Sequence, residues 1–115
     1  MPATNAGAVL VATLVEADGP YWIGAGNSST AFSAAQTDLQ GASKERVSAT
    51  ASRTSGTITY TGVFNTSTGN YEWLEVGLFD AASAGTMLTR KVVALPTKTS
   101  SEEWTVNLEV VFSAA

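Results

Sequence analysis

The clearest pattern of apolar and polar positions lies near the end of the chain. Between positions 104 and 112, large apolar residues occupy every second position, and Thr105, Asn107 and Glu109 stand between them. Side chains alternate between the two faces of a strand, so this pattern predicts a strand with one buried and one solvent-facing side. Positions 57–64 alternate in the same way, with the threonines facing outward.

A predicted hairpin from Tyr71 to Leu95 is the element around which the chain is organised. Two β-rich runs are joined by five small residues, Ala81–Gly85, which fits a hairpin with a longer loop. The first run carries large apolar residues on both faces, so we expect it to be buried on both sides. Glu75 is the exception in that run. A carboxylate in a buried strand needs a partner, and Arg90 on the facing run is the nearest candidate for an ion pair.

Three further stretches are predicted to be strands. Residues 8–16 form an apolar, valine-rich run that favours a strand ending at the Asp18–Pro20 turn. Residues 21–26 predict a short aromatic strand, and residues 44–53 a polar strand at a sheet edge. The small residues at about 1–7 offer nothing to bury, so we expect a short flexible N-terminal arm there.

One stretch, Ser33–Gln40, has the features of a helix. Ser33 can cap it and Gly41 can end it. Because it is too short to be stable alone, we expect one short helical turn that crosses between sheets.

These elements amount to about seven short antiparallel strands with turn signals between them. We therefore expect an all-β fold, a β-sandwich, forming a single domain over residues 1–115, with a small β-barrel as the alternative. The alternation also predicts a set of buried residues: Trp104, Val106, Leu108, Val110, Ile58, Tyr60, Phe64, Leu78 and Phe79.

Composition narrows the chemistry. The chain contains neither Cys nor His, which excludes thiolate chemistry and every His-based catalytic triad and removes the usual zinc ligands. The net charge of −4 argues against nucleic acid as a partner. The apolar run at 9–15 is too short to span a membrane. We therefore expect no enzymatic activity, no cofactor, no metal site, and no binding to nucleic acid or membrane.

Four blocks carry a likeness to a known class of proteins: Ile23–Ser33, Gln36–Gly41, Glu75–Phe79 and Gly85–Lys91. In this order they resemble small structural proteins of tailed bacteriophages, and the resemblance covers roughly residues 21–112. It implies a β-rich module that adheres to other virion proteins. It carries over no catalytic residue.

The resemblance leads to an expected function. We expect a capsid decoration, or cement, protein that binds the major capsid protein on the exterior of the virion, after synthesis in the cytoplasm of the host bacterium. Decoration proteins often sit at three-fold positions of a capsid lattice, so the resemblance implies a homotrimer. The alternative is a tail, baseplate or fibre-attachment component that binds tail proteins.

Five residues are the candidates for contacts with partners: Tyr21, Trp22, Phe32, Val9 and Val11. Aromatic residues are enriched in interface cores, and the valines belong to the apolar N-terminal run. Tyr21 and Trp22 also leave open a third function, a carbohydrate-binding module, because aromatic rings can stack on sugars.

Overall fold

The computed structural model describes residues 4–113 of the chain. A single helix, α1 (Asn5–Ala17), precedes six strands. The strands are β1 (Tyr21–Gly26), β2 (Lys44–Thr54), β3 (Thr57–Phe64), β4 (Glu75–Phe79), β5 (Met87–Val92) and β6 (Trp104–Val111).

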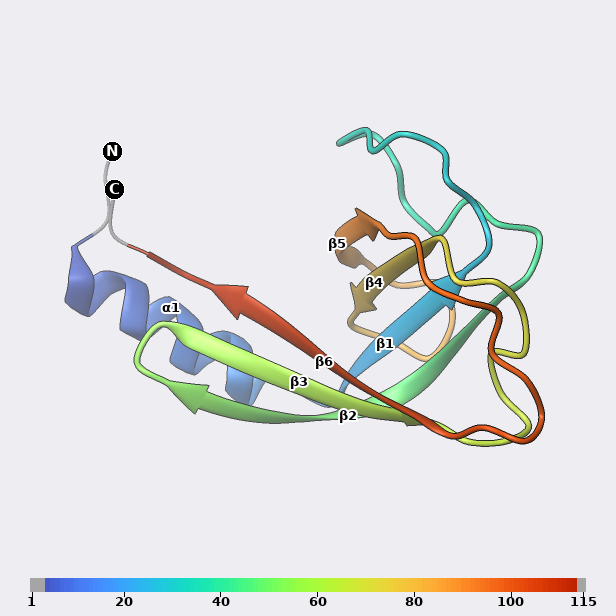
Figure 1. Ribbon diagram of the computed structural model, residues 1–115. Helices are drawn as coiled ribbons and strands as arrows, with labels where there is room; N and C mark the ends of the chain where they lie inside the picture. The colour runs from blue at the N-terminus through green and yellow to red at the C-terminus, as the bar shows by residue number, and fades with distance from the viewer. Residues whose placement is uncertain (1–3, 114–115) are drawn as a thin grey trace.

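The strands form one antiparallel sheet in the order β5-β4-β1-β2-β3-β6, which confirms the all-β class. The sheet curls, and β1 pairs along its whole length with residues 44–49 of β2 (Figure 1). The two halves of the expected sandwich are therefore joined into one sheet. Six strands replace the expected seven, because the first predicted strand is a helix.

Residues 8–16 belong to α1, so the strand predicted there is wrong. Backbone capping explains the helix: the hydroxyl of Thr4 accepts a hydrogen bond from the Gly7 amide, and the Asp18 amide donates to the Leu14 and Val15 carbonyls. Alanine spacing explains its packing, because Ala8 and Ala12 are its buried residues. The helix also takes up part of the predicted arm at about 1–7, of which residues 1–3 lie outside the described chain.

The predicted helical turn at Ser33–Gln40 is reduced to one hydrogen-bonded turn, in which the Gln36 amide donates to the Ser33 carbonyl. A helix cannot continue because the Gln40 and Gly41 amides donate instead to the carboxylate of Glu75. The segment 27–43 is consequently a long loop between β1 and β2.

Five of the predicted core residues are buried, and four of them belong to the hydrophobic core cluster: Ile58, Tyr60, Phe64 and Leu78. The fifth, Phe79, is buried on the other face of β4, where the guanidinium of Arg46 lies over its ring. The four predicted on β6 pack against this core but are only partly buried: Trp104, Val106, Leu108 and Val110. The reason is that β6 is an edge strand, and the sheet's other edge leaves a groove in front of it.

An aromatic cluster closes one end of the core. The ring of Trp73 meets Phe64 and Trp104 edge-on, with ring centres 4.6 and 4.9 Å apart. The Trp73 indole N–H donates to the carbonyl of Gly69, so its one polar group is satisfied. Gly69 has φ +74°, a conformation that side chains rarely adopt, and its missing side chain leaves room for both rings.

A buried lysine holds the loop before β4. Lys98 is 1% exposed, and its ammonium donates to the Asn65 carbonyl and the Asn70 side-chain oxygen at 2.6 and 2.8 Å. We expect Lys98→Met to lower the free energy of unfolding by about 1–3 kcal/mol, because both oxygens lose a charge-assisted donor. Urea unfolding of this variant and of Lys91→Met, at an exposed position, measures the difference. Equal stability of the two variants would show that the hydrogen bonds of the Lys98 ammonium do not stabilise the fold.

Candidate binding surfaces

Two of the three buried charged residues of the described chain are Glu75 on β4 and Arg90 on β5. The predicted ion pair between them is confirmed: Arg90 Nε lies 2.8 Å from Glu75 Oε1, and both side chains are 0% exposed. Arg90 is directly opposite Gly77, two residues along from Glu75, so the register places both side chains on the same face of the hairpin.

The Glu75 carboxylate also binds the loop between β1 and β2. Its Oε1 accepts from the Gln40 amide at 2.8 Å, and its Oε2 accepts from the Gly41 amide at 2.7 Å and the Ser28 amide at 3.3 Å. Arg90 adds weaker bonds to the side-chain oxygen of Gln36 and the carbonyl of Ser28. One carboxylate therefore fixes both ends of residues 27–43, which we call the anchored loop.

Two glycines make room for this arrangement. A Cβ atom at Gly26 would collide with the Glu75 carboxylate, and one at Gly41 would collide with Asn27 and with Glu75. Gly24 leaves similar room for the Phe79 ring. The Gly24-x-Gly26 pattern is therefore explained by close packing around a buried carboxylate.

The first part of the anchored loop, residues 27–37, carries no charge. No charged residue occurs between Gly26 and Asp38, and the ring of Phe32 is 59% exposed. The loop extends beyond the ends of β1 and β2, past the β4–β5 hairpin (Figure 1). Because its two ends are held by Glu75, the loop offers an exposed aromatic side chain on a fixed base.

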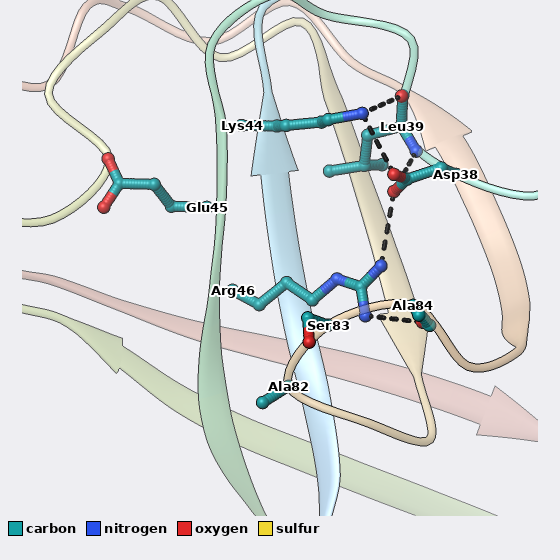
Figure 2. A pocket seen from close by; sticks show the side chains of 8 residues that line it. All are labelled: Asp38, Leu39, Lys44, Glu45, Arg46, Ala82, Ser83 and Ala84. Atoms are coloured by element: carbon teal, nitrogen blue, oxygen red, sulfur yellow. Dashed lines mark hydrogen bonds and ion pairs between the residues drawn. The ribbon is translucent and has the colours of Figure 1, made fainter.

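A hollow of about 370 Å³ lies beside this loop, lined by residues of β2 and of the β4–β5 turn (Figure 2). Arg46 donates to the carbonyls of Ala81 and Ala84, and its guanidinium lies 3.5 Å from the centre of the Phe79 ring. Asp38 pairs with Arg46 and Lys44 at 3.3 and 2.9 Å. Asp38, Lys44 and Arg46 thus tie the anchored loop and the hairpin turn to β2.

The pKa of Asp38 reports on this network. Partial burial alone would raise the pKa, but hydrogen bonds from Lys44, the Leu39 amide and Arg46, together with the charge of Lys44, lower it below 3.8. The ionised carboxylate is favoured in the folded state, so its contribution to stability is present above the unfolded pKa and is lost as the pH falls below 3.8.

A carboxyl-carbon NMR titration should accordingly give Asp38 a midpoint below 3.8, and Lys44→Met should raise that midpoint. Glu72→Ala, far from the network in sequence and on an exposed residue, should leave it in place. A midpoint at or above 3.8 in the unaltered protein would contradict the network.

The structure buries one of the candidate contact residues and leaves the others at least partly exposed. Tyr21 is 5% exposed; its ring stacks on Tyr60 and its hydroxyl donates to Asp18, so its proposed role as a contact residue is corrected to a core role. Burial, followed by the bond to Asp18, raises the pKa of Tyr21 to about 12. It packs inward because it shares the core-facing side of β1 with Ile23 and Ala25. Trp22, on the other face of β1, is partly exposed.

The remaining candidates lie on α1. Val9 is partly exposed and Val11 is 46% exposed. Two neighbours that we did not single out, Leu10 and Leu14, are more exposed still, at 60% and 61%. These three exposed residues, Leu10, Val11 and Leu14, define what we call the outer face of α1.

A groove separates the two edges of the curled sheet. It has a volume of about 530 Å³, and its walls include Val93 and Leu95 after β5 and Trp104, Val106 and Leu108 on β6. We call it the β5–β6 groove. The alternation of β6 was visible in the sequence, but the opening in front of it depends on how far the sheet closes, which no local pattern encodes.

Among residues 4–113, no group of three or more acidic residues is placed to hold a metal ion. No helix in this range is long and apolar enough to cross a membrane. Comparisons with protein-family models, curated proteins and solved structures found no match.

Proposed function

We propose that this protein is a structural component of a tailed-bacteriophage virion, namely a capsid decoration protein that binds the outside of the major capsid shell and stabilises it. The phage assignment is supported by the sequence resemblance alone. The four blocks that carry it include Glu75, Arg90 and both ends of the anchored loop. The motifs thus coincide with the residues that hold this loop in place.

The observation that carries the assembly role is the amount of uncovered apolar surface. The outer face of α1 is apolar and exposed, and the β5–β6 groove is lined by apolar side chains. Exposed apolar patches of this kind mark sites at which proteins bind partners. A decoration protein would cover both surfaces, because it contacts its own copies and the shell.

The proposed structural role includes no enzymatic activity, and the contacts of Glu75 are consistent with this. The buried carboxylate of Glu75 is fully engaged by Arg90 and by backbone amides, so it has no free oxygen with which to take a proton from a substrate. In this proposal the protein is made in the cytoplasm of the host bacterium and is carried on the capsid exterior as a homotrimer.

Purified particles test the location. Quantitative mass spectrometry of intact virions, isolated capsids and isolated tails should find the protein on capsids, in a fixed ratio to the major capsid protein. Copies confined to tails would contradict the decoration role and support the tail, baseplate or fibre-attachment alternative. Absence from all particles would overturn the phage assignment.

Phe32 provides a residue-level prediction. We expect Phe32→Ala to weaken binding to shells lacking the protein by at least about tenfold, because an exposed aromatic residue on a fixed base is typical of a binding hot spot. Val63→Ala, at another exposed apolar position, is the matched control and should bind as the unaltered protein does. Co-sedimentation with the shells measures both. Equal binding of the two variants would remove Phe32 from the interface.

A further inference from the structure

Helix α1 is attached to the rest of the molecule by few side chains. It packs beside the distal ends of β2 and β3 (Figure 1), and its buried residues are Ala8 and Ala12. Val15 is partly buried against the core cluster. Two methyl groups and part of one valine remove little apolar surface from water. The contact between α1 and the sheet therefore contributes far less to folding than the contacts among the strands.

The N-terminal half of α1 lies over a hollow. This hollow has a volume of about 340 Å³ and is lined by Ala8 and Val9 of the helix and by Gly56 and Phe112 at the end of the sheet. Side chains that border such a space lack part of the van der Waals contacts that a packed interface would give them. The fit of α1 to the sheet is accordingly loose at this end.

One ion pair joins the last turn of α1 to the sheet. Arg53 Nε on β2 lies 3.2 Å from Glu16 Oε1, and the two side chains are 26% and 32% exposed. An ion pair that solvent reaches in this way stabilises a contact only weakly. The caps of α1, at Thr4 and Asp18, both belong to the helix's own segment, so the helix can leave the sheet without losing them.

An unsatisfied polar group lies beside the same turn. The hydroxyl of Tyr60 on β3 is buried and has no hydrogen-bond partner within residues 4–113. Burial, followed by the charges of Glu16 and Asp18, raises the pKa of this hydroxyl, so the end of α1 lies near it. A buried polar group without a partner destabilises the arrangement that buries it. Water that enters when α1 moves away can bind this hydroxyl and so favours the movement.

We propose that α1 opens from the sheet as a unit, about a hinge in the exposed Asp18–Pro20 turn, while β1 to β6 stay folded. The ladder hydrogen bonds between the strands and the aromatic cluster around Trp73 do not involve α1, so they persist in the open state. A helix of 13 residues is only marginally stable in water without its packing, so its amides and its inner side chains become accessible to solvent.

This conformational device goes beyond the proposed function and does not depend on it. A partner that covers the outer face of α1 in its docked position favours the closed state. A partner that binds the inner side, which carries Ala8 and Ala12, favours the open state. The helix is thus a strap whose position a binding event can set without unfolding the sheet.

Cysteine labelling tests the opening, since the natural chain contains no Cys. Ala12 on α1 and Ala25 on β1 are both 0% exposed, so Ala12→Cys and Ala25→Cys form a matched pair. Without denaturant, we expect an excess of a thiol reagent to label the Ala12→Cys protein at least about a hundredfold faster than the Ala25→Cys protein. Equal rates, after each is corrected for the stability of its variant in urea, would mean that α1 opens only when the whole chain unfolds. That result would overturn the proposal.

Hydrogen exchange of the unaltered protein excludes an effect of the substitutions themselves. The amides of residues 9–17 should exchange through an opening whose free energy depends little on urea, because little surface is exposed when α1 leaves the sheet. The amides of β1 and β4 should exchange through global unfolding, whose free energy falls steeply with urea. The same steep dependence for α1 as for β1 and β4 would overturn the proposal.

Discussion

Glu75→Ala is expected to lower the free energy of unfolding by about 3–5 kcal/mol. The substitution leaves Arg90 buried without its counter-charge and frees the Gln40 and Gly41 amides from the carboxylate that holds them. The anchored loop should then detach at both ends. Urea unfolding measures the stability, and amide hydrogen exchange at residues 28–41 measures the detachment.

Two variants make this result specific. Glu72→Ala removes an exposed carboxylate only three residues away and should change stability by less than about 0.5 kcal/mol. The pair Glu75→Leu with Arg90→Met should recover much of the stability lost by Glu75→Ala, since no buried charge remains, while leaving the loop amides exchanging fast. A Glu75→Ala protein as stable as Glu72→Ala would contradict the anchoring role.

Trp73→Ala is expected to cost about 3–5 kcal/mol of stability, through the cavity it leaves in the aromatic cluster. Its indole is 0% exposed, contacts Phe64 and Trp104, and donates a hydrogen bond to Gly69. Trp73→Phe should cost less, because a smaller aromatic ring still fills part of the space, although the indole hydrogen bond is lost.

Trp22→Ala is the control for losing a tryptophan, because Trp22 is only partly buried and should cost clearly less than Trp73. Thermal unfolding of the three variants ranks them. If Trp22→Ala proved as costly as Trp73→Ala, the stabilising aromatic cluster would not be centred on Trp73.

Much of the sheet could be predicted from sequence because strand alternation is a local signal. β3 and β6 lie within the stretches that alternate, and β4 and β5 within the predicted hairpin. The pairing of Glu75 with Arg90 could be predicted because a carboxylate in an otherwise apolar strand needs a partner. Closure of the sheet could not be predicted in the same way, because it depends on register and curl over all six strands.

The helix was missed for a physical reason. Its valines and the absence of charge hide the 3.6-residue period, and only the alanines at 8 and 12 mark the buried side. Thr4 as N-cap was the available signal. The loop anchoring was missed because its donors are backbone amides, which carry no residue-type signature; Gly26 and Gly41 were the only hints.

No feature of the sequence predicts that Lys98 is buried. It lies in a polar loop, where a lysine is normally solvated, and its burial results from the neighbouring loop at 65–70 folding over it. Tyr21 was misplaced because the turn beside it favoured exposure, whereas it lies on the core-facing side of β1.

The most direct test of the account is the mass of the isolated protein in solution. The account holds that the chain is an assembly module whose exposed apolar surfaces, the outer face of α1 and the β5–β6 groove, are covered in the assembled state. Sedimentation equilibrium over a wide range of concentrations should give the mass of three chains of 11.9 kDa each, falling to one chain only on dilution. A mass of 11.9 kDa at every concentration, for the folded protein, would contradict it.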